Sequence, residues 1–178
     1  MSSSNQTHFE WFSVPCQFDI DLRELRTTYL ELQKQLHPDK SAGESELDQN
    51  TAVRLNTKLN DAYDKLKDPV KRAIYLLELQ GIEYDPDRQT QNDPIYLMQQ
   101  LEIREELGDL TADDPKLDSH LDKFRSLALA QLEQYSEEFR MAQTKNDWPL
   151  ACAAIGRMMF ANKLTRDVNE REEQLLDL

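Results

Sequence analysis

The sequence predicts an all-α protein built from two helical modules. Glycine is scarce, at 4 of 178 residues, and Leu, Glu, Gln, Lys and Ala are abundant, which favours long helices over sheets. Apolar residues recur at spacings of three and four along most of the chain. A polar stretch without this periodicity separates two helical regions. We therefore expect an N-terminal module over residues 1–81, a linker over 82–92 and a C-terminal three-helix bundle over 93–178.

The first predicted helix extends from about Asp19 or Asp21 to Leu36. Its apolar stripe consists of Leu22, Leu25, Tyr29, Leu32 and Leu36. Such a stripe must face a partner helix. Pro38 disfavours helical geometry in the residue before it and Gly43 permits a reversal, so the helix should stop before them.

A second helix is expected from near Ser45, with Asp48 completing a variant of the capping box. Its apolar stripe consists of Leu55, Leu59, Ala62 and Leu66. The two stripes match in length, so these helices should pack antiparallel across a short polar loop. Asp68-Pro69 then caps and starts a third helix, which carries Ile74 and Leu77 and ends at Gly81.

Three more helices are predicted after the linker. They extend from Asp93-Pro94 to about Asp109, from Pro115 to near Thr144, and from about Trp148 to Leu176. The long middle helix has an apolar stripe at helical spacing, from Leu117 to Phe139. Because the connections are short, these helices should form an antiparallel bundle.

The charge distribution limits the possible partners and the compartment. Residues 1–81 carry 10 basic and 13 acidic residues, and residues 82–178 carry 11 and 21, for a net charge of -13. A phosphate backbone selects for clustered Lys and Arg, so nucleic acid is not expected as a partner. No apolar stretch reaches transmembrane length, and the polar start differs from a secretory signal or transit peptide. Cys16 and Cys152 are expected to be buried thiols of a cytosolic protein.

No cofactor, metal or catalytic group is expected. Two distant cysteines and the scattered His8, His37 and His120 cannot supply the four ligands of a structural zinc site or a cluster. The isolated glycines exclude a phosphate-binding loop. His37 and Asp39 flank a proline within one turn, which is poor geometry for a base and its orienting carboxylate. The sequence therefore argues against an enzyme.

A basic helix face leads into the tripeptide His37-Pro38-Asp39. On a helical wheel, Arg23, Arg26 and Lys34 lie together with Leu30, away from the apolar stripe. This arrangement suits docking on an acidic protein surface. The alternative is an ordinary solvated helix face that ends at a proline, since charged stripes often only improve solubility.

The tripeptide between two leucine-patterned helices resembles the characteristic loop of the J-domain family, over residues from about His8 to Gly81. The resemblance implies binding to a heat-shock ATPase chaperone of the DnaK/HscA type and stimulation of its ATP hydrolysis. The implied contact residues are His37, Pro38 and Asp39, assisted by Arg23, Arg26, Lys34 and Lys40. Glu24 and Glu31 make the preceding helix less basic than in generalist members. This departure implies a dedicated chaperone rather than promiscuous pairing.

Two apolar faces are expected on the first helix of the second module. Tyr96, Ile103, Leu107 and Leu110 group on one side and can supply the bundle core. Leu97, Met98 and Leu101 point elsewhere, beside Glu102 and Glu105. Exposed apolar residues of this kind are candidates for a protein-binding patch. Alternatively, the helix is buried on both sides, as is common in the centre of a small bundle.

The segment from Leu97 to Glu106, the chain length and the acidic second half resemble the HscB family of J-type co-chaperones in iron-sulfur cluster assembly. The resemblance implies that this module holds an IscU-type scaffold while the J domain recruits an HscA-type chaperone. The implied scaffold-binding residues are Leu97, Met98, Leu101 and Phe160, with Glu102 and Glu105 as a polar rim. The chain lacks the Cys-x-x-Cys motifs of eukaryotic members, which implies a bacterial cytosolic form that assists cluster transfer without holding iron.

Two other functions remain open from the sequence. A general J-domain co-chaperone would deliver many unfolded clients to a DnaK-type chaperone. A metal- or cluster-carrying protein is opposed by the shortage of ligands.

Overall fold

The computed structural model describes residues 6–36, 46–86 and 94–176, except for the side chains of residues 46–49 and 95. The chain divides into two compact units, Met1–Gly81 and Ile82–Leu178. All regular elements in the described ranges are helices. The predicted all-α class is confirmed.

The first unit contains α1 (His8–Trp11), α2 (Leu22–Gln35), α3 (Glu46–Lys67) and α4 (Pro69–Leu79). Two of these helices begin where an aspartate can cap them. Oδ1 of Asp21 accepts hydrogen bonds from the backbone N–H groups of the second and third residues of α2, at 2.8 and 3.2 Å. Asp68 does the same for α4, with Pro69 in the first helical position. Gly81, with φ of +75°, follows the end of α4.

Helices α2 and α3 pack through an aromatic pair and a small apolar core. The rings of Tyr29 and Tyr63 stack at 4.0 Å, and the Tyr29 hydroxyl donates a hydrogen bond to Oδ1 of Asn60 at 3.0 Å. Among the described side chains of these two helices, the buried apolar ones are Leu25 on α2 and Leu59, Ala62 and Leu66 on α3. The expected interface of these helices is therefore present over its central part.

The predicted stripes were wrong at two positions. Leu22 and Leu55 are exposed, although the helical period assigned both to the interface. Leu22 is the first residue of α2, where fewer neighbours cover a side chain. Leu55 lies in the first half of α3, which at 22 residues is longer than α2 at 14, so the expected match in length does not hold.

The short helix α1 was not predicted, because four residues are too few for a periodic pattern. Thr7 caps it in a complete capping box with Glu10, and Phe9 and Phe12 are fully buried. The His8 ring stacks on Tyr75 of α4 at 4.4 Å, and the His8 backbone N–H donates to the Tyr75 hydroxyl at 3.0 Å. These contacts fix the N-terminal segment to α4.

His8 should make the stability of the first unit depend on pH. Partial burial of the ring, together with the nearby charge of Lys65, lowers the pKa of His8 below its ordinary value of 6.5. The unfolded chain therefore binds a proton more readily than the folded one. The stability that comes from keeping the His8 ring neutral is fully present above about pH 6.5. It is lost as the pH falls through the pKa that His8 has in the folded protein.

We expect the thermal midpoint to fall between about pH 7.5 and about pH 5.5, and to fall less in His8→Phe, which keeps a ring without a titrating group. Circular dichroism during heating, in buffers of equal ionic strength, measures both midpoints. Equal pH slopes for the two proteins would contradict this assignment.

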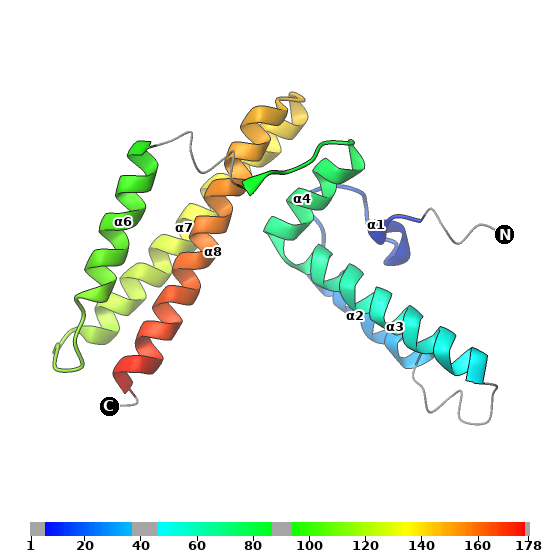
Figure 1. Cartoon of the computed structure of the whole chain (residues 1–178), viewed down its shortest axis with the longest axis horizontal. Coiled ribbons are helices and arrows are strands. Elements are labelled where there is room, and N and C mark those ends of the chain that lie inside the picture. Colours follow the sequence, from blue (N-terminus) through cyan, green and yellow to red (C-terminus); the bar gives the residue numbers. More distant parts are fainter. Residues whose placement is uncertain (1–5, 37–45, 87–93, 177–178) are drawn as a thin grey trace. The chain divides into compact units, whose positions relative to one another are not determined.

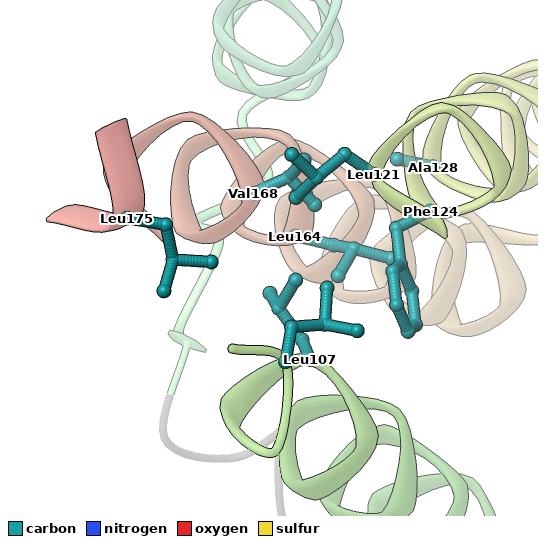
Figure 2. Packing of buried hydrophobic residues seen from close by; sticks show 8 residues of the cluster. Leu107, Leu121, Phe124, Ala128, Leu164, Val168 and Leu175 are labelled. Atoms are coloured by element: carbon teal, nitrogen blue, oxygen red, sulfur yellow. The ribbon is translucent and has the colours of Figure 1, made fainter. Parts of the chain in front are cut away.

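The second unit contains α6 (Pro94–Gly108), α7 (Leu117–Thr144) and α8 (Trp148–Leu176). Helices α7 and α8 are joined by a short turn and run antiparallel along most of their length (Figure 1). One end of the bundle is held by a buried apolar cluster, drawn in Figure 2. The cluster consists of Leu107, Leu110, Leu121, Phe124, Ala128, Leu164, Val168 and Leu175.

Arg171 of α8 completes the attachment of α6 at this end. Its Nη2 donates to the backbone carbonyls of Gly108, at 2.7 Å, and Leu110. Carbonyl groups at the C-terminal end of a helix have no N–H donor within the helix. The Arg171 guanidinium supplies the donors for these two carbonyls. The end of α6 is thereby fastened to α8.

Part of the stretch predicted as a linker packs against α8. The Tyr84 hydroxyl donates to Sδ of Met159 at 3.4 Å. Burial raises the pKa of Tyr84 to about 12, and the Cys152 thiol lies close enough to add to the shift. Residues 82–86 therefore lie on the second unit, and residues 87–92 fall outside the described residues.

The two cysteines differ in exposure. Cys152 is buried, as expected, whereas Cys16 is exposed, so the prediction of a second buried thiol was wrong. Cys16 lies in the irregular segment between α1 and α2, where no helical pattern indicates which side chains face inward.

Candidate protein-binding surfaces

The basic face of α2 is exposed in the first unit. Arg23, Arg26 and Lys34 are all exposed, and Leu30, at their centre on the helical wheel, is exposed as well. The opposite side of α2 is anchored through the buried Leu25. Three cations and an apolar residue are therefore presented together, which is an arrangement suited to an acidic protein surface.

The predicted tripeptide lies outside the described residues. This applies to His37, Pro38, Asp39 and Lys40, so their roles stay a prediction. What the structure describes is the approach to them: α2 ends at Gln35, and the Leu36 backbone N–H still donates to the Leu32 carbonyl at 3.0 Å. The exposed basic face thus continues to within a few residues of the tripeptide.

A second surface lies on α6. Met98 and Leu101 are 64% and 57% exposed, Glu102 and Glu105 are exposed, and Leu97 is half-buried. We call the apolar residues Leu97, Met98, Leu101 and Phe160 the α6 patch. The other side of α6 is buried through Tyr96, Gln100 and Leu107. The alternative in which this helix is buried on both sides is therefore wrong.

Phe160 of α8 joins the α6 patch through Tyr96. The two rings meet edge to face, with centroids 5.6 Å apart and planes at 75°. Phe160 is only partly buried. Because Tyr96 directly precedes Leu97 and Met98, this contact brings the α8 ring close to the start of the α6 patch.

The structure also shows residues that sequence reasoning missed. Tyr96 and Tyr135 meet edge to face at 5.9 Å, and the Arg157 guanidinium lies 5.8 and 5.9 Å from these two ring centroids. Arg157 also pairs with Glu138 of α7, with Nη1 to Oε2 at 2.9 Å. Gln100 is buried on the inner side of α6. The helical period placed Tyr96 on the side that supplies the bundle core, but no sequence signal paired Arg157 with the two rings.

The described residues offer little for chemistry on a small molecule. Within residues 6–36, 46–86 and 94–176, no group of three or more His, Cys, Asp or Glu side chains could hold a metal ion. The His120 ring contacts the Asp114 carboxylate, with 2.9 Å between Nδ1 and Oδ2, so this histidine has a partner within the unit. Among the described helices, none is long and apolar enough to cross a membrane.

Two family descriptions match the chain, one for each unit. Residues 8–75 match the DnaJ domain. Residues 92–169 match the domain described as the HSCB C-terminal oligomerisation domain. The first match includes α2 and its basic face, and the second includes the α6 patch.

Similar proteins cover almost the whole chain. The Co-chaperone protein HscB homolog of Vibrio cholerae serotype O1 is 41% identical over 170 residues, which are 95% of this chain and 98% of that protein. The homolog of Aliivibrio salmonicida is 38% identical over 175 residues, with coverages of 95% and 98%.

Solved structures give the same result. The chaperone HscB from Vibrio cholerae has a TM-score of 0.84 at 38% identity, over 96% of this chain and 99% of that chain. The human co-chaperone protein HscB has the same TM-score at 23% identity, over 98% and 86%, and shares the fold.

Proposed function

Because this chain belongs to the HscB family of J-domain co-chaperones, we propose that it binds an IscU-type iron-sulfur scaffold and delivers it to an HscA-type heat-shock ATPase chaperone. It is a co-chaperone that regulates an ATPase and not itself an enzyme. Its role is to stimulate ATP hydrolysis by the chaperone and so to aid cluster transfer, in the cytoplasm of a bacterium. We assign residues 1–81 to chaperone recruitment and 93–178 to scaffold binding, with 82–92 as the connection, of which residues 82–86 lie on the second unit.

The observation that carries this proposal is the presence of two different exposed surfaces on two separate units of one chain. The surface on the first unit is cationic, through Arg23, Arg26 and Lys34, and continues toward His37-Pro38-Asp39 and Lys40. A basic face of this kind attracts an acidic face of the chaperone and fixes how the two surfaces align when they bind.

The surface on the second unit is apolar with an acidic edge. The α6 patch supplies the apolar contact area, and Glu102 and Glu105 are exposed on the same helix. An interface with an apolar centre and a charged rim fits a folded partner that presents an apolar spot bordered by Lys or Arg. A folded scaffold protein can present such an apolar spot with a basic border at a fixed position. A mixture of unfolded chains cannot.

Joining the two surfaces in one molecule explains delivery. When the scaffold is bound to the second unit, binding of the chaperone by the first unit raises the local concentration of scaffold at the chaperone. No chemical step at the co-chaperone is needed. The rival function, delivery of unfolded clients in general, is disfavoured by Glu24 and Glu31, which are exposed on α2 and reduce its net positive charge.

A single-turnover ATPase assay with purified chaperone tests the proposal. We expect the co-chaperone and the scaffold together to stimulate hydrolysis by more than the sum of their separate effects, because each contact favours the other. A chemically denatured polypeptide at the same concentration should not replace the scaffold. Equal stimulation by the denatured polypeptide would favour the general co-chaperone instead.

A further inference from the structure

We propose that Arg157 is a positioning residue for scaffold binding, which holds the first turns of α6 in the orientation that presents the α6 patch. This inference rests on the proposed function of that patch. Its starting point is the contact between Arg157 and the two rings of Tyr96 and Tyr135, which join α8 to α6 and α7.

The two ends of α6 are attached in different ways. The C-terminal end lies in the leucine-rich cluster of Figure 2 and is fastened by Arg171. In the first two turns, the buried side chains among those described are Tyr96 and Gln100. Nε2 of Gln100 has no hydrogen-bond partner, whereas the Tyr96 ring contacts side chains of both other helices. Tyr96 is therefore the principal anchor of the end that carries the patch.

Tyr96 contacts three side chains of the other two helices. Its ring meets Tyr135 and Phe160 edge to face, and the Arg157 guanidinium lies 5.8 Å from its centroid. Its hydroxyl also donates to the Arg157 carbonyl at 3.4 Å. Cation–π contacts and edge-to-face pairs depend on orientation, so together they select one rotation of α6 about its axis.

Glu138 keeps the Arg157 guanidinium in place. The two side chains are 29% and 23% exposed, so their ion pair is better shielded from solvent than the exposed pairs of α7. The chain of contacts thus extends from Glu138 through Arg157 to Tyr96 and the adjacent Leu97 and Met98. A change at Arg157 should therefore alter the α6 patch without removing any of its residues.

Arg157→Met keeps much of the side-chain length and removes the cation. If the first turns of α6 then hold the binding orientation about one-tenth of the time, the dissociation constant for purified scaffold rises about tenfold. Arg157→Lys keeps the charge and should restore most of the affinity. Stimulation of the chaperone without scaffold should not change, because it depends on the first unit.

Arg125→Met is the matched control. Arg125 of α7 pairs with Glu172 of α8 with similar exposure, 31% and 32%, but lies by the leucine-rich end of the unit, next to Phe124. Loss of the Arg125 charge removes an ion pair between α7 and α8 that is comparable to the Arg157–Glu138 pair but lies away from the α6 patch. We expect scaffold affinity to stay within about twofold of that of the unaltered protein.

The experiment combines calorimetric titration of full-length variants with scaffold and hydrogen exchange of the free proteins. Support requires weaker binding by Arg157→Met together with faster amide exchange in the second turn of α6. Unchanged binding, or weaker binding with unchanged exchange in α6, would overturn the positioning role. Two other failures are distinguishable from this one. The α6 patch is not the site if a variant with Leu97→Ala, Met98→Ala and Leu101→Ala binds scaffold normally, and the proposed function fails if the unaltered protein does not bind scaffold.

Discussion

Asp39→Asn should reduce stimulation of the chaperone ATPase by at least about thirtyfold while leaving scaffold affinity unchanged. Replacing the carboxylate with an amide removes a charge from the centre of the proposed contact, and loss of one partner of a buried charged pair costs about 2 kcal/mol or more. Because the first unit carries this contact and the second unit binds scaffold, only one activity should change. Single-turnover ATP hydrolysis and calorimetry with scaffold measure the two separately.

Asp61→Asn is the matched control for this variant. Asp61 is an exposed aspartate of α3 in the same unit, and the same substitution there should leave stimulation within about twofold. If Asp39→Asn stimulated as well as the unaltered protein, the assignment of the first unit to chaperone recruitment would be wrong.

Replacing Leu97, Met98 and Leu101 together by Ala should weaken scaffold binding by about 100-fold, or about 2.7 kcal/mol. Apolar residues at the centre of an interface contribute most of its binding energy, whereas exposed side chains contribute little to folding. The thermal midpoint should therefore fall only slightly, mainly through the half-buried Leu97. The double change at Met98 and Leu101 should leave the midpoint nearly unaltered.

Two control variants separate binding from stability. Leu129 of α7 is 64% exposed, as Met98 is, so Leu129→Ala tests loss of an exposed leucine from another helix of the unit and should not affect scaffold binding. Leu107→Ala removes a buried side chain and should lower the free energy of unfolding by about 2 to 5 kcal/mol. Normal scaffold binding by the triple variant would exclude the α6 patch as the binding site.

Most helix bounds followed from local pattern. The prediction for the last helix, Trp148 to Leu176, agrees with α8, and Asp68-Pro69 marked the start of α4. Backbone hydrogen bonds in a helix join residues four apart, and a cap bonds to N–H groups two or three residues away. The information that sets these features is therefore contained in short stretches of chain.

Exposure was harder to predict than helicity. Leu22 and Leu55 fit an apolar stripe but are exposed, and Cys16 is exposed where burial was expected. Tyr84, in the predicted linker, packs against Met159. Each outcome depends on how far a neighbouring element extends, and a helical period contains no information about the length or position of a partner.

The α6 patch also shows which features follow from local sequence and which depend on tertiary contacts. Spacing along α6 was enough to separate Tyr96 and Leu107 from Met98 and Leu101, because each residue of a helix advances by about 100° and the two pairs therefore point to different sides. Spacing could not show whether one side or both would be covered, nor that Arg157 would reach Tyr96 across 61 residues of sequence. Those features arise from contacts between helices distant in the chain, so they are established only when the bundle has assembled.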